Sequence, residues 1–246
     1  MHNTLRIATF NIHKGVTSFN ARLVLHEQRE LLRRLQADIL FLQEVRGMHA
    51  RHRHLIDGSQ YEYLADSIWQ DFAYGKNAVY PAGHHGNAVL SRFPITSWDN
   101  EDISAHEIEQ RGMLHCVIDI PGWDRPLHCI CVHLGLFARW RRQQLIALRN
   151  RIDSLVPPEA PLVIAGDFND WRVKAGRILV DGLHLKEAFE QKEGRPARSF
   201  PSVFPLFRLD RIYVRGFHVQ QANVHRSAAF ARVSDHAALS AIVTRL

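Results

Sequence analysis

The sequence predicts a layered α/β fold, in which two β-sheets pack face to face and helices cover their outer surfaces. Strand-like segments outnumber helical ones, helical patterns occur in both halves of the chain, and an opening strand–helix–strand unit is followed by a run of hairpins. With 246 residues, 46% of them hydrophobic, and no repeat or long Gly/Ser linker, we expect one domain over residues 1–246.

The first unit is a strand, a helix and a second strand. Residues 5–12 alternate β-branched and aromatic side chains with others, which is typical of a strand. Residues 22–36 place Leu31, Leu32 and Leu35 on one apolar stripe, which predicts a helix. Residues 38–44 form an apolar run that ends on a carboxylate. This order of elements indicates parallel pairing of the two strands.

The middle of the chain is expected to form antiparallel hairpins, because short β-like segments alternate there with Gly, Pro and Asp. These segments are 61–65, 77–80, 86–91, 95–103, 111–120 and 127–132. A second helix is predicted over 137–156, where Pro157 and Pro158 end it. The later elements are a buried strand from Leu162 into Asp167, a helix-like region over 174–189, a loop over 195–207, and strands over 209–214 and 237–243.

Polar side chains stand at or beside the ends of these strands, where sites of layered α/β folds are usually built. They are Asn11, Glu44, His133, Asp167, Asn169, Asp210 and His236. Each alone has an ordinary structural explanation, such as a loop cap, a core histidine or a local ion pair. Seven in one placement indicate a functional site. The two-residue period of a strand is expected to put Asp167 and Asn169 on the same side.

The residue types suit metal-assisted chemistry at phosphate. Glu44 is a hard oxygen ligand of the kind that binds Mg²⁺ or Mn²⁺. His236 can pair with Asp235 beside it or with Asp210 elsewhere, which would fix its tautomer and stabilise its charged form. We expect Asp167 to hold or deprotonate a water molecule. Asn169, His133 and Arg111 would then stabilise charge on phosphate oxygens.

The composition and net charge favour certain classes of binding partner. A net charge of +6 favours a polyanion, namely nucleic acid, an anionic membrane surface or a phosphorylated small molecule, although basic residues also simply solvate helix faces. Three cysteines argue against a disulfide framework, and two of them, Cys129 and Cys131, are expected on one buried strand face. With no signal peptide or long apolar span visible, we expect a cytoplasmic protein. No obligate protein partner is evident.

Eight motifs in order carry a family resemblance over nearly the whole chain. They are Thr9-Phe10-Asn11, Leu42-Gln43-Glu44-Val45, Gly86-Asn87-Ala88-Val89-Leu90-Ser91-Arg92, Arg111-Gly112, Val132-His133-Leu134, Gly166-Asp167-Phe168-Asn169, Leu209-Asp210-Arg211-Ile212 and Ser234-Asp235-His236. The sequence thereby resembles the endonuclease/exonuclease/phosphatase (DNase I-like) superfamily. The resemblance implies a four-layer α/β/β/α sandwich with two mixed central β-sheets.

The resemblance also implies residue roles. Mg²⁺ (or Mn²⁺) would be bound by Glu44, assisted by Asn11 and Asp235. Asp167 would orient the attacking water, Asn169 and His133 would contact the phosphate, and His236 would act with Asp210 in acid–base or electrostatic catalysis. Arg46, Asn87 and Arg111 are the expected phosphate or substrate contacts. The family's last motif usually has proline two residues after the histidine, where Ala238 stands, and we expect only a change in loop rigidity.

The expected activity is that of a metal-dependent phosphodiesterase acting on nucleic acid or a phospholipid-type diester. A phosphomonoesterase of the inositol-phosphate type and a catalytically silent polyanion-binding protein are the alternatives. Trp140 lies among arginines at the start of the second predicted helix, where it would stack on a base or meet lipid headgroups, or else anchor the helix in the core. The loop with Phe200, Phe204 and Phe207 is either a membrane-facing lip or plain packing.

Overall fold

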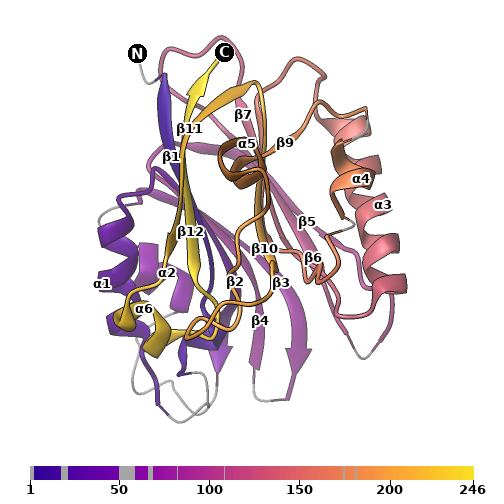
Figure 1. The fold of residues 1–246 in the computed structure, drawn as a ribbon. Coiled ribbons are helices and arrows are strands. Elements are labelled where there is room, and N and C mark those ends of the chain that lie inside the picture. Colours follow the sequence, from indigo (N-terminus) through magenta and orange to yellow (C-terminus); the bar gives the residue numbers. More distant parts are fainter. Residues whose placement is uncertain are drawn as a thin grey trace.

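Two six-stranded mixed β-sheets form the centre of the structure, and helices flank them on both sides (Figure 1). The computed structural model describes residues 3–17, 22–49, 59–65, 69–81, 83–107, 109–173, 175–180 and 182–246. The first sheet has the order β11-β12-β1-β2-β4-β3 and the second the order β5-β6-β7-β8-β10-β9.

The strands of the first sheet are β1 (Thr4–Asn11), β2 (Ile39–His49), β3 (Asp71–Tyr80), β4 (Gly83–Ser91), β11 (Phe217–His225) and β12 (Ala238–Arg245). Those of the second are β5 (Ile95–Asp102), β6 (Gly112–Ile118), β7 (Leu127–His133), β8 (Leu162–Asp167), β9 (Lys186–Glu187) and β10 (Asp210–Arg215). The helices are η1 (His13–Gly15, a 3₁₀ turn), α1 (Leu25–Leu35), α2 (Gln60–Ala65), α3 (Ala138–Leu155), α4 (Ala175–Val180), α5 (Ala188–Glu193) and α6 (Ala228–Val233).

Side-chain alternation along the strands produces the layers. Ile7 of β1 faces the core between the sheets together with Val163 of β8, whereas its neighbour Ala8 faces α1, α2 and α6. On the second sheet, Ile164 faces α3 and α4. Figure 1 shows these two groups of helices on opposite sides of the paired sheets. The arrangement is the predicted four-layer α/β/β/α sandwich.

The pairing follows the predicted pattern. β1 and β2 are parallel, as are β7 and β8, because a helix or a longer connection separates the members of each pair. The middle hairpins, β3–β4, β5–β6 and β6–β7, are antiparallel. Cys129 and Cys131 both lie in the core between the sheets, and all three cysteines are buried and free.

Three local predictions were wrong or incomplete. Residues 61–65 belong to helix α2, because Ser59 and Glu62 form a capping box: Ser59 donates its backbone N–H to Glu62 Oε2 at 3.0 Å, and its Oγ accepts from the Glu62 N–H at 3.3 Å. The helix-like region over 174–189 divides into α4, β9 and part of α5, since Gly182 (φ +84°) interrupts it. Strand β11 and helix α6 were not predicted. Among the described residues, no helix is long and apolar enough to cross a membrane.

Candidate active site

Three adjacent strands of the second sheet bring a histidine and two aspartates into one row. His133 is paired with Asp167 across β7 and β8, and Asp167 is paired with Asp210 across β8 and β10. Gly166 makes the approach of β8 to β7 possible: its φ is +148°, and a Cβ there would lie 1.9 Å from the Val132 carbonyl oxygen. The position of Asp167 at the end of β8 therefore depends on a glycine at the residue before it.

His236, two residues before β12 of the other sheet, lies against this row. Its Nδ1 lies 2.9 Å from Asp210 Oδ2, and its Nε2 lies 3.7 Å from Asp167 Oδ2. Burial alone would lower the pKa of His236, but the carboxylates of Asp210 and Asp167 outweigh it and raise the pKa to about 10. His236 is thus an imidazolium at neutral pH.

Asp167 is buried and accepts from two donors. The Asn11 amide Nδ2 lies 3.2 Å from its Oδ2, and the Asn169 backbone N–H donates to its Oδ1 at 2.9 Å. Burial raises the pKa of Asp167 to about 6, and His236 and these donors act against a larger rise. Near neutral pH this carboxylate is therefore mostly ionised and close to its titration midpoint, as a general base requires.

Glu44 also lies at this site, on an irregular part of β2. The register of β2 against β4 shifts between Leu42 and Val45, and Glu44 has φ +58°, a conformation that non-glycine residues rarely adopt. Asn11 Nδ2 donates to Glu44 Oε1 at 3.2 Å, and Lys14 Nζ lies 3.6 Å from Oε2. Burial favours the neutral acid, but Lys14 and Asn11 hold the pKa of Glu44 below its usual value.

Asp235 lies beside His13, not in the pair with His236. His13 Nδ1 is 3.2 Å from Asp235 Oδ1, and the His13 N–H donates to Asn11 Oδ1 at 3.1 Å. Contact with Asp235 raises the pKa of His13, and burial only partly offsets this. Burial alone would raise the pKa of Asp235, but the contact with His13 outweighs this effect and the pKa is lowered.

These oxygen donors fit a hard divalent cation. Glu44 and Asp235 have lowered pKa values and are therefore ionised, which is the state a metal ligand needs, and Asn11, which contacts Glu44 through its amide nitrogen, has an amide oxygen as a further hard donor. A second group, Asp167, Asp210 and His236, has ligand atoms within 4.8 Å of one another. It fits less well, because the His236 imidazole carries a proton on both nitrogens and would have to lose one.

A cleft of about 630 Å³ opens over Glu44, Asp167 and His236. Its walls come from both sheets and from the loops that join their elements, and the residues that line it include Lys14, Glu44, Val79, His85, Glu107, Glu109, Arg111, Leu136, His133, Asp167, Asn169, Trp171, Phe200 and His236. Burial, with Arg111 and His236 nearby, holds the pKa of His133 well below its usual value, so its ring is neutral. Arg111 projects into the cleft and pairs with Glu109 at 3.1 Å.

Asn169 reaches the cleft by a different route from the one predicted. β8 ends at Asp167, and Asn169 has φ +48°, so the strand period does not apply to it. Its backbone N–H instead folds back onto Asp167, and its amide Nδ2 donates to the Leu134 carbonyl at 2.9 Å. The two side chains remain neighbours because of this turn.

Three predicted substrate contacts lie outside the open cleft. Asn87 is fully buried between the sheets, where its Nδ2 donates to the carbonyls of Gly112 (2.9 Å) and Cys131 (3.3 Å). Arg46 donates its backbone N–H to Gln60 and does not line the cleft. Trp140 is only 7% exposed and packs on Phe137 and His106 at centroid distances of 4.6 and 4.9 Å, which leaves its ring no free face for a base.

The sequence reasoning missed three residues of the cleft, Lys14, His85 and Trp171, and also His13, which pairs with Asp235. The His-Lys-Gly turn directly after Asn11 was a usable signal, because a short turn keeps those side chains next to the strand end. His85 stands beside the Gly86-Asn87 motif and was overlooked. Burial lowers its pKa to about 4, so it is a neutral histidine in the cleft wall.

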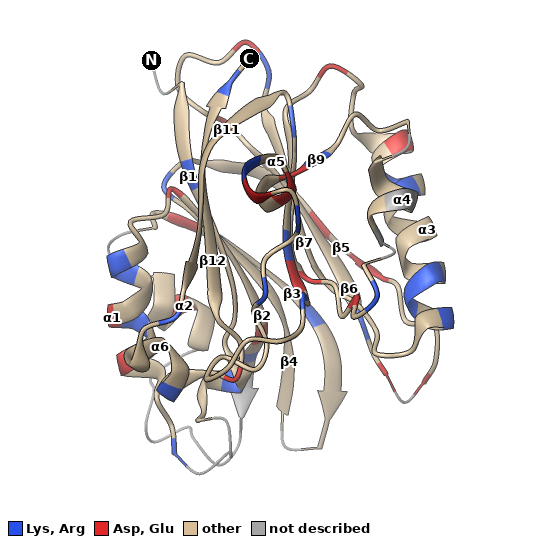
Figure 2. Cartoon of the chain, in the orientation of Figure 1, with Lys and Arg blue, Asp and Glu red and all other residues tan. Residues whose placement is uncertain are grey.

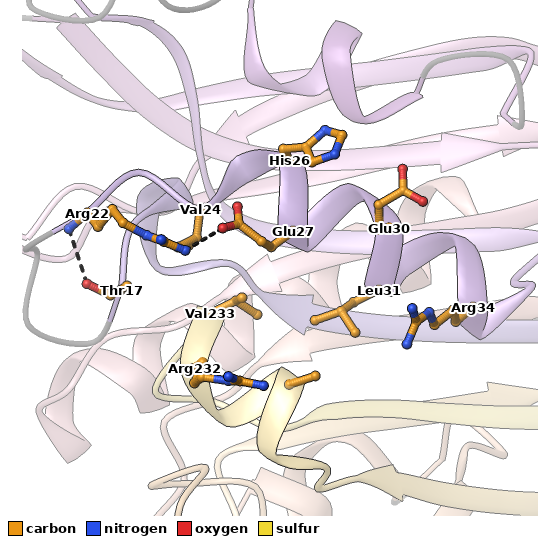
Figure 3. A pocket seen from close by; sticks show the side chains of 11 residues that line it. Thr17, Arg22, Val24, His26, Glu27, Glu30, Leu31, Arg34, Arg232 and Val233 are labelled. Atoms are coloured by element: carbon orange, nitrogen blue, oxygen red, sulfur yellow. Dashed lines mark hydrogen bonds and ion pairs between the residues drawn. The ribbon is translucent and has the colours of Figure 1, made fainter.

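A second hollow of about 630 Å³ lies between α1 and α6, away from all these residues (Figure 3). Val24, Leu31 and Val233 form its floor, and Arg22 pairs with Glu27 at its edge. It contains none of the predicted site residues. The chemistry of the chain therefore points to the cleft over Asp167.

Comparisons with known proteins agree with this fold. The sequence pattern of the Endonuclease/Exonuclease/phosphatase family matches residues 8–236. The uncharacterized protein YbhP of Escherichia coli K12 is 48% identical over 242 residues, covering 97% of this chain and 95% of the relative.

Solved structures share the fold at low identity. An endonuclease/exonuclease/phosphatase from Beutenbergia cavernae matches with a TM-score of 0.78 at 21% identity, over 99% of this chain and 72% of that one. The human Nocturnin catalytic domain with bound sulfate matches with 0.76 at 18%, over 100% and 94%. Truncated Caenorhabditis elegans TDP2 matches with 0.70 at 18%, over 98% and 97%. From its sequence pattern and its fold, the chain belongs to the endonuclease/exonuclease/phosphatase family.

Proposed function

We propose that the protein is a divalent-metal-dependent phosphodiesterase whose active site is the cleft over Asp167. The observation that carries the proposal is the buried row Asp210–His236–Asp167, which joins an imidazolium to a carboxylate that titrates near neutral pH. Such a row places a base and a positive charge within reach of one phosphate. Hydrolysis of a phosphate ester needs both, because a water molecule must be activated and negative charge builds on the phosphate oxygens.

Each residue has a role that its surroundings support. Asp167 accepts a hydrogen bond from the attacking water and takes its proton, while the Asn11 amide and the Asn169 N–H keep the carboxylate oriented. The imidazolium of His236, which Asp210 orients, donates to the phosphate. The neutral ring of His133 and the guanidinium of Arg111 donate from the facing wall. Asn169 is the further expected phosphate contact.

Glu44, Asn11 and Asp235 would hold Mg²⁺ or Mn²⁺. When bound, such a cation supplies charge neutralisation for the phosphate oxygens and the leaving group. Lys14 and His13 are the ion-pair partners of the two carboxylates, and Lys14 also lines the cleft.

A diester is favoured over a monoester because of the charge in the cleft. Glu107 and Glu109 line it beside Arg111, and Glu109 already engages that guanidinium. A monoester dianion would need more uncompensated positive charge than a diester monoanion. The phosphomonoesterase function remains the second candidate.

The test compares bis(p-nitrophenyl) phosphate with p-nitrophenyl phosphate, each with Mg²⁺, with Mn²⁺ and with EDTA. We expect metal-dependent release of nitrophenol from the diester, lost in Asp167→Asn. Faster turnover of the monoester would favour the second candidate. A folded protein without metal-dependent turnover of either ester, or of DNA or phospholipid diesters, would refute the enzyme proposal.

A further inference from the structure

Exposed apolar side chains occur on three segments that also supply residues to the cleft wall, namely those that carry Leu136, Trp171 and Phe200. We call them the rim patch; on one side they are Trp171, Val173, Val203, Phe204, Leu206 and Phe207, and on the other Leu136 and Phe137. Val203 is 81% exposed, Phe204 70% and Phe137 58%. Trp171 and Leu136 also line the cleft itself, so the patch continues the cleft walls outward. Exposed apolar surface next to a cleft is typical of an interaction site.

The loop that carries Phe204 is held rigidly. The Leu206 and Phe207 N–H groups both donate to the Phe200 carbonyl at 2.8 Å, and the Phe204 N–H donates to Pro201 at 3.2 Å. At its base the ring of Phe200 contacts His236, with centroids 5.0 Å apart, and the ring of Phe207 packs on Trp171 at 4.8 Å. The base is thus packed against the active site, and the tip at Val203 and Phe204 projects without packing.

The same loop is hydrogen-bonded to the segment directly before His236. The Ser202 N–H donates to the Asp235 carbonyl at 2.7 Å, and Ser202 Oγ donates to the Ser234 carbonyl at 2.7 Å. Any surface on which Phe204 rests is therefore at a fixed distance from His236. The position of the tip relative to the cleft is built into the fold.

Positive charge accompanies the patch. Arg139 and Arg142 follow Phe137 in the first turns of α3, Arg172 follows Trp171, and Arg198 stands near the start of the loop; all four are exposed. In the described part of the chain, no acidic side chain forms an ion pair with any of the four. Figure 2 shows Lys and Arg positions at the lower end of α3. The pKa of Arg208 in the same loop is lowered. Burial is the largest cause, and the nearby charges of Arg198 and Arg195 add to it.

Apolar side chains beside unpaired arginines match an anionic bilayer, in which acyl chains lie beneath negative headgroups. Single-stranded nucleic acid would use the aromatic rings as stacking surfaces, but Leu136, Val173, Val203 and Leu206 offer no ring. We propose that the rim patch seats the mouth of the cleft on an anionic lipid surface, so that the substrate is a phospholipid-type diester in the bilayer. This inference rests on the proposed function for its substrate but not for the binding.

Binding is tested apart from catalysis, in EDTA. The full chain is sedimented with phosphatidylcholine vesicles and with vesicles that also contain phosphatidylglycerol. We expect binding to the mixed vesicles, lowered about tenfold or more by the double change Val203→Ser/Phe204→Ser. Trp98→Ser is the matched control: Trp98 is 53% exposed on edge strand β5, outside the cleft and the rim patch, and its loss should not change binding.

The double variant should keep the wild-type melting temperature and its rate on soluble bis(p-nitrophenyl) phosphate, while its rate on vesicle phospholipid falls. Equal binding by the double variant and the wild type, or an equal loss in Trp98→Ser, would overturn the inference. So would a wild-type chain that ignores vesicles but binds single-stranded DNA through Phe204. Vesicle binding without turnover of any diester would instead refute the proposed function and leave the surface assignment standing.

Discussion

His236 Nδ1 lies 2.9 Å from Asp210 Oδ2, and the opposite nitrogen of the same ring lies 3.7 Å from Asp167 Oδ2. One imidazolium therefore stands between two buried carboxylates, and its charge depends on both. Asp210 orients the ring from the side away from the cleft, since it is absent from the cleft walls whereas His236 and Asp167 line them. A change at Asp210 should thus act on catalysis through His236.

Asp210→Asn should lower the rate on bis(p-nitrophenyl) phosphate about 10²–10⁴-fold, because His236 loses the carboxylate whose negative charge stabilises its imidazolium form. The His236 pKa, followed by NMR titration of its ring protons, should fall in the same variant. Asp119→Asn, at an exposed position, is the control and should change neither quantity. A lost rate with an unchanged His236 pKa would contradict the positioning role of Asp210.

The rate should rise with pH between about 5 and 7. Asp167 acts as the base only when ionised, and its pKa is raised to about 6. A cation bound nearby stabilises the carboxylate, so the midpoint of this limb should lie at or below that value. The measurement is a pH profile of kcat/KM at saturating Mg²⁺. A rate that falls over this range would show that a protonated Asp167 is the active form.

Lys14→Met should tighten Mg²⁺ or Mn²⁺ binding several-fold. Lys14 Nζ lies 3.6 Å from Glu44 Oε2 and competes with any cation for that carboxylate. Calorimetry or Mn²⁺ electron paramagnetic resonance measures the affinity without reference to turnover. Lys186→Met, an exposed change on β9, serves as control. Weaker metal binding in Lys14→Met would argue against the assignment of Glu44 as a ligand.

Glu187→Gln should stabilise the protein selectively at high pH. Burial raises the pKa of Glu187 to about 7, well above its value in an unfolded chain, so the folded state binds more protons between about pH 4.5 and 7. The stability that Glu187 contributes is full below that range and is lost as pH rises through it, at roughly 1.4 kcal/mol per pH unit at most.

The Glu187→Gln change would keep the cap of α5, because the amide oxygen of the new side chain can still accept from the Glu190 N–H, as the Glu187 carboxylate does at 2.7 Å. The measurement is the free energy of unfolding by urea at pH 5 and pH 8 for both chains. The difference between variant and wild type should grow in favour of the variant at pH 8. A constant difference would mean that Glu187 is ionised in the folded state throughout.

Much of the fold could be predicted because its signals are local. Alternation along residues 5–12 and 127–132 determines which side chains enter the core between the sheets, whatever the partner strands are. The errors were also local in origin: the capping box Ser59–Glu62 was not recognised, and Gly182 was not taken as an interruption. Asn169 reached the site by a turn with positive φ, which no strand pattern predicts.

The sequence by itself determined the family and the layered architecture, because ordered motifs and side-chain periodicity are properties of the chain alone. Only the tertiary structure decided which of the polar side chains contact one another. The residues allowed His236 to pair with Asp235 or with Asp210; in the folded chain Asp235 meets His13, while His236 crosses to Asp210 on the other sheet. The burial of Trp140 and the exposure of Phe204 were decided in the same way, by which surfaces other segments cover.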